Sequence, residues 1–234
     1  MIVHALVECE ALQDEVVTVR RVEIDETISR RSTARVEFTL AATLDPSVLM
    51  NRPMLIGLAD DGGTVLRMFS GLVAAATELA STVIERTVLR VELTSLMEAL
   101  SRSADFRIFQ DATAEDIVRD VLTKAGVAAD AVEFRCDATL AKRSSKTQYG
   151  STHQAFVEEV LGEDGLSWFA RHEADGPGLC FGKGNALWQT PSRPYTFKAQ
   201  TGLDGGEFVS RVERVTKMRP ASVTLRDHDF TKPA

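Results

Sequence analysis

The N-terminal part of the chain alternates apolar and polar residues along the sequence, which is the pattern of strands that bury one face. The apolar positions are Ala34, Val36, Phe38 and Leu40 in one segment and Leu89, Val91 and Leu93 in another. The polar positions between and beside them, Thr94 included, are expected to face solvent. Both segments are therefore predicted to be half-buried strands.

Turn signals join these strands into an antiparallel arrangement. Residues 60–63 read Asp-Asp-Gly-Gly between two apolar segments, which predicts a hairpin turn. Around Arg20 and Arg21 the apolar positions change parity, which predicts a β-bulge. Closely spaced strands with tight turns and no helix pattern favour a small antiparallel barrel or sandwich over residues 1–95.

The clearest helix pattern follows a short helical turn at residues 96–102. Thr113, with Asp116 three residues later, predicts a capping box at its start. Apolar residues then recur at the spacing of one helix face. This stripe consists of Ala114, Ile117, Val118, Val121, Leu122 and Ala125. Gly126 is expected to end the helix, because glycine readily adopts the left-handed conformation found after many helices.

A second helix, a glycine turn and an aromatic strand are predicted next. The expected cap residues are Ser151 and Thr152, and the expected apolar face is Phe156, Val157, Val160 and Leu161. Glu158 and Glu159 fall on the opposite side of this helix. Gly162 and Gly165 allow the backbone to leave it, and residues 166–171 read as a strand.

The remaining segments are rich in glycine and proline turns. Strands are predicted at residues 178–182, 186–188, 208–218 and 223–226, with a linker at residues 190–194. The whole pattern predicts an α+β protein that is mainly antiparallel β. We expect a tube-like barrel at residues 1–95, an inserted helix-containing α/β module at 96–190, and returning strands at 191–234.

The composition is that of a globular protein, since the 234 residues are 44% hydrophobic and 26% charged. A net charge of −7 argues against a general nucleic-acid-binding protein, which needs a basic surface for phosphates. No apolar run approaches the ~20 residues of a membrane-spanning helix, and residues 1–12 are too charged for a signal peptide. Synthesis in the cytoplasm is expected, with the three cysteines as reduced, mostly buried thiols.

No group of side chains predicts a metal or cofactor site. The soft metal ligands are His4, His153, His172, His228, Cys9, Cys136 and Cys180. None of them form the close pairs that zinc sites require. Residues 176–184 contain glycines and a lysine but lack the spacing of a phosphate-binding loop, so a hairpin turn is expected there. Ser70 lacks the Gly-x-Ser-x-Gly context of a hydrolase nucleophile.

Two charged clusters receive a structural interpretation. The acidic cluster is Glu158, Glu159, Glu163 and Asp164, and the basic group is Lys142, Arg143 and Lys146. Paired carboxylates can hydrolyse glycosides, but these lie on or just after a solvated helix face with no sugar platform evident. The basic group has too few charges for nucleic acid and is expected to be a solvated loop. No catalytic, cofactor-binding or metal-binding residue is assigned, and the chain is not expected to be an enzyme.

Three motifs carry a resemblance to a known family. The spacing of Tyr149, Phe156, Glu158, Gly165, Trp168 and Phe169 resembles QYxExDxxFxxRLxEExGIxYxF, a signature of the VgrG proteins of type VI secretion. Residues 107–111, reading RIFQD, are similar to a second motif of that family, and residues 223–230 resemble VxLRDYDF with His228 replacing tyrosine. The sequence departs from the first motif at Gly150, Ser151 and Val160.

The resemblance implies a structural hub and spike base. In that family three chains surround a channel, cap a tube of ring-forming Hcp proteins and carry a spike with its tip and effector proteins. It implies a homotrimer without a small-molecule substrate or nucleic acid, assembled in the cytoplasm and secreted or injected on firing. The alternative is a hub of a phage or phage-like tail, of the late control protein D type; an enzyme is less favoured. The sequence is expected to stop where a full-length protein continues toward the spike.

Overall fold

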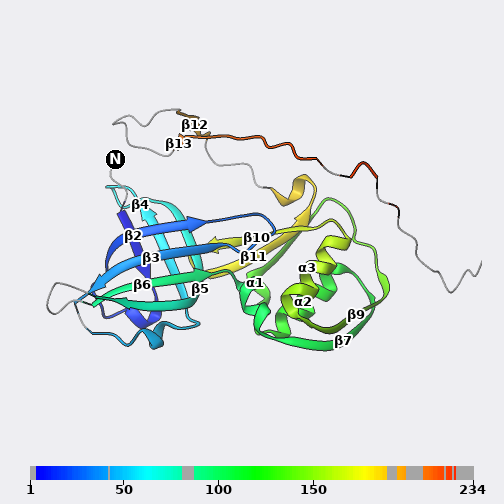
Figure 1. The fold of residues 1–234 in the computed structure, drawn as a ribbon, viewed down its shortest axis with the longest axis horizontal. Coiled ribbons are helices and arrows are strands. Elements are labelled where there is room, and N and C mark those ends of the chain that lie inside the picture. Colours follow the sequence, from blue (N-terminus) through cyan, green and yellow to red (C-terminus); the bar gives the residue numbers. More distant parts are fainter. Residues whose placement is uncertain are drawn as a thin grey trace, which may run out of the picture. The chain divides into compact units, whose positions relative to one another are not determined.

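The computed structural model describes residues 4–41, 43–80, 87–188, 194–198, 208–218, 220–222 and 224. They belong to two compact units, residues 1–190 and residues 191–234. The first unit combines a curled antiparallel sheet with a smaller module that holds the long helices (Figure 1). The predicted α+β class, mainly antiparallel β with a barrel and a helix-containing module, is confirmed. Among the described residues, no helix is long and apolar enough to cross a bilayer.

The larger sheet of the first unit has six strands in the order β1-β4-β5-β6-β3-β2. They are β1 (His4–Glu8), β2 (Thr18–Asp25), β3 (Thr33–Leu40), β4 (Pro53–Ala59), β5 (Val65–Leu79) and β6 (Thr87–Thr94). Short 3-10 helices, η1 (Glu10–Leu12) and η2 (Pro46–Leu49), lie in the connections. The sheet curls so that its edge strands β1 and β2 approach each other, which makes a nearly closed barrel (Figure 1).

The interior of the barrel contains the apolar faces that the alternation predicted. Strands β3 and β6 pair so that Phe38 lies opposite Leu89 and Val36 opposite Val91, and all four side chains are buried. The prediction for Thr94 was wrong, because this residue is buried rather than solvated. At this end β6 leads into the helical module and lies beside β5, which also contacts strands β10 and β11 of that module.

Two local predictions about the barrel strands are confirmed. The pairing of β2 with β3 shifts register between Val19 and Arg21, which is the expected bulge. The hairpin between β4 and β5 is closed by Asp60, whose carboxylate accepts hydrogen bonds from the backbone N–H groups of Gly62 and Thr64, both at 2.9 Å. An aspartate that bonds nearby backbone groups stabilises a turn without any distant partner.

The module of the first unit contains a three-stranded sheet, a two-stranded ribbon and the helices. The sheet has the order β10-β11-β8 and the ribbon is β7-β9. The elements are α1 (Leu96–Ala99), η3 (Leu100–Arg102), β7 (Ala104–Ala112), α2 (Ala114–Lys124), η4 (Ala129–Ala131), β8 (Val132–Cys136), β9 (Arg143–Thr152), α3 (His153–Glu163), β10 (Ser167–Glu173), β11 (Gly176–Lys183) and η5 (Asn185–Leu187). Helices α2 and α3 pack together, and the ribbon runs along them (Figure 1).

Helix α2 begins with the predicted capping box. The hydroxyl of Thr113 accepts a hydrogen bond from the Asp116 backbone N–H at 3.1 Å, and the Asp116 carboxylate accepts one from the Thr113 N–H at 2.9 Å. The buried stripe is Ala114, Ile117, Val118, Val121 and Leu122. Ala125 was predicted in this stripe but is exposed, because the helix ends at Lys124 and the chain turns at Gly126, which has φ of 86°.

Helix α3 also follows its predicted pattern. Thr152 caps it by accepting a hydrogen bond from the Ala155 backbone N–H at 3.2 Å. Phe156, Val157, Val160 and Leu161 are buried, whereas Glu158 and Glu159 are exposed. The left-handed residue after the helix is Gly165, with φ of 64°, while Gly162 lies inside the helix. The chain then enters β10, where Trp168 is buried in the module core.

The strand predicted at residues 178–182 is confirmed as part of β11, so the hairpin turn expected over residues 176–184 is wrong for most of that segment. The turn itself precedes the strand, and β11 pairs antiparallel with β10 and parallel with β8. Gly182 shows what the glycines do there: a Cβ at this position would lie 1.8 Å from the carbonyl oxygen of Arg135 on β8. Glycine is required because the two backbones approach too closely for any side chain.

The strand predicted at residues 186–188 is also wrong, because the chain forms the 3-10 helix η5 there. The carboxylate of Asp137 accepts hydrogen bonds from the backbone N–H groups of Asn185 at 2.6 Å and Ala186 at 3.0 Å. A helical turn therefore starts at this point, capped by a residue far away in the sequence. Leu187 is buried against the module as a result.

The second unit contains one short parallel pair within its described residues, β12 (Thr196–Phe197) with β13 (Phe208–Val209). The strand predicted over residues 208–218 thus covers only its first two positions. Residues 210–218 are exposed and pair with no strand among the described residues. Most of the predicted linker and of the strand at 223–226 lies outside the described residues.

Candidate interaction surfaces

The histidines, which are the ordinary candidates for acid–base or metal chemistry, are dispersed. His4 is exposed, with Nε2 3.1 Å from a carboxylate oxygen of Asp61. His153 is buried, and its Nδ1 lies 3.1 Å from the side-chain nitrogen of Gln148. His228 lies outside the described residues. In the described part of the chain, no three His, Cys, Asp or Glu side chains are grouped as a metal site requires.

The cysteines are free thiols, as expected from their spacing. Cys9 and Cys180 are buried and Cys136 is half-buried. Burial raises the pKa of the Cys180 thiol. A thiol with a raised pKa stays protonated near neutral pH and is a poor nucleophile.

His172 on β10 contacts two distant segments of the chain. Its Nε2 lies 3.0 Å from a carboxylate oxygen of Glu26, and its Nδ1 lies 3.1 Å from the backbone nitrogen of Ser70 on β5. The imidazole ring also stacks on Phe69, with ring centroids 4.3 Å apart. The hydrogen bond from His172 holds the pKa of Glu26 below its usual range, against burial and with help from Arg67. These contacts join the barrel to the module.

Ser70, His172 and Glu26 have the residue types of a hydrolase triad, but their geometry is different. A triad needs the serine hydroxyl on one ring nitrogen and the carboxylate on the other. Here Nδ1 of His172 faces the backbone of Ser70, and the Ser70 hydroxyl is buried with no hydrogen-bond partner among the described atoms. The arrangement has no activated nucleophile and is suited to fixing two segments in place.

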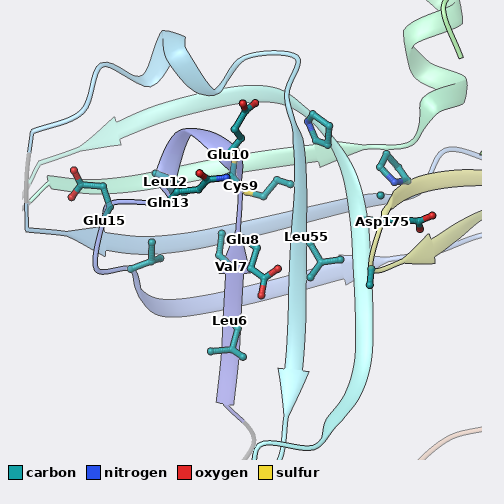
Figure 2. Close-up of a pocket in the computed structure, with 17 residues that line it drawn as sticks. Leu6, Val7, Glu8, Cys9, Glu10, Leu12, Gln13, Glu15, Leu55 and Asp175 are labelled. Atoms are coloured by element: carbon teal, nitrogen blue, oxygen red, sulfur yellow. The ribbon is translucent and has the colours of Figure 1, made fainter. Parts of the chain in front are cut away.

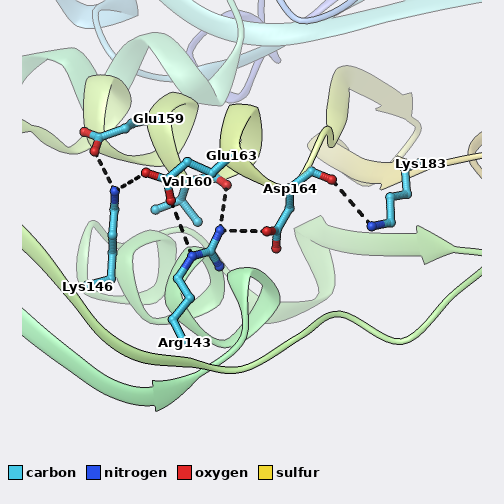
Figure 3. A network of polar contacts seen from close by, with 7 residues as sticks. All are labelled: Arg143, Lys146, Glu159, Val160, Glu163, Asp164 and Lys183. Carbon is cyan, nitrogen blue, oxygen red and sulfur yellow. Dashed lines mark hydrogen bonds and ion pairs between the residues drawn. The ribbon is translucent and has the colours of Figure 1, made fainter. Parts of the chain in front are cut away.

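The two charged clusters noted in the sequence meet in one network between β9 and α3 (Figure 3). Lys146 donates to Glu159 at 2.5 Å and to Glu163 at 2.6 Å. Arg143 donates to Asp164 at 2.8 Å, and its Nε lies 3.4 Å from Glu163. The network pairs Glu159, Glu163 and Asp164 with cations, while the exposed Glu158 accepts a hydrogen bond from Gln154. The ion pairs hold the ribbon strand β9 against the helix.

The expectation that the basic group is a solvated loop is therefore wrong for two of its members. Arg143 and Lys146 lie on strand β9, and their side chains are only 17% and 13% exposed. Burial acts to lower the pKa of Lys146, but its hydrogen bonds to Glu159 and Glu163 outweigh burial and raise it. Partly buried charges are stable when paired in this way. Lys142 alone is exposed as expected.

The ribbon β7-β9 has two very different faces. The inward face carries Arg107 opposite Gln148 and Phe109 opposite Lys146, all buried or half-buried. The outward pairs are Phe106 with Tyr149, Ile108 with Thr147, and Gln110 with Ser145. All six outward residues are exposed. We call these six residues the ribbon face.

Large apolar side chains lie together on the ribbon face. Phe106 and Ile108 are each 69% exposed and Tyr149 is 83% exposed. The rings of Phe106 and Tyr149 pack edge to face with centroids 5.2 Å apart. Polarity does not separate the two faces: the inward face carries Arg107, Lys146 and Gln148 beside Phe109, and the outward face carries Phe106, Ile108 and Tyr149 beside three polar residues. Sequence reasoning therefore missed this surface, although period-two alternation was visible.

A second surface feature is a groove of about 650 Å³ at one end of the barrel (Figure 2). It is bordered by β1, η1, β4 and the turn between β10 and β11. Leu6, Leu12 and Leu55 supply apolar surface. Its acidic residues are Glu8, Glu10, Glu15 and Asp175. Of these, Glu10 pairs with Arg52 at 2.8 Å. The groove brings together segments far apart in the sequence, and no local pattern indicated it.

Comparison with known proteins identifies related chains. Residues 25–234 match the family described as phage tail baseplate hub (GPD). The type VI secretion system spike protein VgrG4b of Pseudomonas aeruginosa is 30% identical over 193 residues, which are 82% of this chain and 23% of that protein. The chain thus spans about a quarter of the length of this relative.

Two solved structures share the fold. One is an Escherichia coli component of the type VI secretion system, described as similar to the T4 bacteriophage tail proteins gp27 and gp5. It aligns with a TM-score of 0.70 at 21% identity, over 82% of this chain and 52% of that chain. The other is the tail protein from Neisseria meningitidis MC58, with a TM-score of 0.59 at 15% identity, over 86% and 56% of the two chains.

Proposed function

Since the chain belongs to the phage tail baseplate hub (GPD) family, we propose that it is a structural hub and spike-base component of a type VI secretion machine. The observation that supports this most directly is the family match over residues 25–234, on a chain folded as a barrel with an inserted module. The relatedness to VgrG4b favours a secretion machine over the alternative, a hub of a phage or phage-like tail. A tail protein shares the fold, which keeps that alternative open to test.

The three predicted segments have separate roles in this proposal. The barrel at residues 1–95 is a wall segment of the tube-like hub, the module at 96–190 braces it, and residues 191–234 lead toward the spike. Three copies form a ring that caps a tube of Hcp-like rings and carries the spike tip and effector proteins. The protein is made and assembled in the cytoplasm and is secreted or injected on firing. Neither nucleic acid nor a small-molecule substrate takes part.

The proposed role is structural and not enzymatic. The residue types that could carry catalysis are engaged elsewhere: His172 and Glu26 join barrel and module, and the carboxylates of Glu159 and Glu163 pair with Lys146. Catalysis of hydrolysis needs an activated nucleophile or a free acid and base at a cleft.

The test is deletion of the gene that encodes this chain in its source bacterium. Loss of the Hcp-like tube protein from the culture medium, restored by the wild-type gene, is the expected result. Unchanged release of the tube protein, with loss of phage or phage-like tail particles, would instead establish the alternative. A gene that carries Glu159→Gln, which removes one carboxylate of the acidic cluster, is also expected to restore release of the tube protein, because the proposed role involves no catalysis.

A further inference from the structure

The groove at the end of the barrel carries negative charge that the chain leaves unpaired. Its lining includes four carboxylates and no lysine, arginine or histidine among the described residues. Glu10 pairs with Arg52, whereas Glu8, Glu15 and Asp175 form no ion pair within the described part of the chain. A cleft lined by one sign of charge concentrates its electric field and attracts groups of the opposite charge. The groove therefore favours a cationic occupant.

Apolar side chains lie next to these carboxylates. Glu8 on β1 lies directly opposite Leu55 on β4, so their side chains share one face of the sheet. Leu6, two residues before Glu8, lies on the same face and is 51% exposed. A bare inorganic cation would leave these leucines in water. An occupant with a cation beside an apolar side chain pairs the carboxylate and covers the leucines at the same time.

One strand further in, the same face carries a polar group without a partner. Ser70 on β5 lies opposite Leu55, so Glu8, Leu55 and Ser70 form a row across three neighbouring strands. Ser70 lines the groove, is only 1% exposed, and its hydroxyl has no hydrogen-bond partner among the described atoms. A buried hydroxyl without a partner is unfavourable. A backbone N–H or C=O of an occupant that extends past Leu55 would supply that partner.

The carboxylates are spread along the groove and do not converge on one point (Figure 2). Glu15 and Asp175 lie at opposite sides of the view, with Glu8 and Glu10 between them. Among the described residues, no three His, Cys, Asp or Glu side chains are grouped as a metal site requires. The groove volume of about 650 Å³ also has room for several side chains. Its shape and charge thus fit a segment with more than one cation.

We propose that the groove binds an extended segment of a partner protein in which arginine or lysine side chains alternate with apolar ones. The cations pair with Glu8 and Asp175, and the apolar side chains cover Leu6 and Leu55. Arginine suits the cationic positions because its guanidinium can bond one carboxylate through two parallel N–H groups. The proposal does not rest on the hub role, which the release of tube protein tests separately.

Fluorescence anisotropy with a labelled peptide of alternating arginine and leucine tests the groove. The double variant Glu8→Gln and Asp175→Asn removes two of its carboxylates. The control, Glu78→Gln and Asp111→Asn, removes the same two residue types at exposed positions outside the groove that form no ion pair among the described residues. Both variants carry the same net charge, so general attraction of the peptide to the chain is matched. We expect the dissociation constant to rise roughly tenfold or more for the groove variant and less than about twofold for the control.

Ser70→Ala tests the inner end of the groove. The hydroxyl that this substitution removes has no partner in the described structure, so the midpoint of thermal unfolding is expected to stay the same or rise. Binding of the peptide is expected to weaken about threefold, because one hydrogen bond to the occupant is lost. A fall in the midpoint with unchanged binding would show that the hydroxyl serves the fold, and would overturn its place in the site.

The remaining outcomes separate the proposed occupant from others. Equal weakening by the two double variants overturns the assignment of the groove, and so does a peptide that fails to bind at about 1 mM. A peptide with serine in place of leucine is expected to bind roughly tenfold more weakly; equal binding would reduce the interaction to general charge attraction and overturn the proposal. Sedimentation that shows self-association lost in the groove variant, without peptide binding, would assign the groove to a second copy instead.

Discussion

Replacing Gly182 by alanine probes the closest backbone approach in the module. The new Cβ would lie 1.8 Å from the Arg135 carbonyl oxygen and 2.8 Å from its carbonyl carbon, where real Cβ contacts are not found below 3.0 Å. Strand β11 must move away from β8, and β11 lies at the centre of its sheet, so both of its pairings are disturbed. Overpacking typically costs about 1–3 kcal/mol, and a clash with fixed backbone belongs at or above the upper end.

The matched control is Gly162→Ala on the solvent side of helix α3. No atom lies within 4 Å of the Cβ that this substitution adds, and the backbone is already helical. Alanine in a helix is favoured over glycine by about 0.5–1 kcal/mol, so this variant is expected to be more stable than the wild type. The same methyl group thus has opposite effects at the two positions.

Thermal unfolding followed by circular dichroism measures both variants. For a chain of this size, 1 kcal/mol shifts the midpoint by roughly 2–4 °C. We expect Gly182→Ala to lower the midpoint by about 6 °C or more and Gly162→Ala to raise it by about 1–4 °C. A Gly182→Ala variant that melts with the wild type would refute the parallel register of β8 and β11, since that register creates the clash.

Other substitutions test the helix face and the pH dependence. Phe156→Ala, which removes a fully buried ring that stacks on Phe109, is expected to cost about 3–5 kcal/mol in urea unfolding. Glu159→Ala is expected to stay within about 1 kcal/mol, because that side chain is over half exposed and Lys146 keeps Glu163; equal losses for the two would contradict the placement of the face. The pKa of Glu26 is lowered in the folded protein, so ionised Glu26 stabilises the fold fully above pH 4.5, its ordinary pKa, and this stabilisation is lost as the pH falls through the folded-state pKa. Unfolding measured over a pH series should show this loss in the wild type and not in Glu26→Gln. Burial lowers the pKa of His153 in the folded protein, so just below pH 6.5 the unfolded chain binds more protons than the folded one. The free energy of unfolding should therefore begin to decrease as the pH falls below 6.5, and His153→Gln should remove this decrease.

The elements predicted correctly from the sequence depend on residues close together in the chain. The capping box of Thr113 and Asp116 and the Asp60 turn are complete within a few residues, so their hydrogen bonds form whatever surrounds them. The failures have distant causes. The 3-10 helix at Asn185–Leu187 begins where it does because Asp137 caps it. Lys146 is shielded from solvent because its partner Glu159 lies on helix α3.

The apolar and polar periods of the sequence by themselves determined the strands of the barrel, the two long helices and their buried stripes, and the motifs that indicated the family. They did not determine which face of the ribbon strands β7 and β9 is covered. Alternation defines two faces of β7 and β9 equally well, and only packing against α3 decided that Lys146 turns inward to the glutamates while Tyr149 turns outward. Burial depends on what lies opposite a side chain, and a paired lysine can be buried where an aromatic ring is left exposed. The tertiary structure alone therefore located the ribbon face.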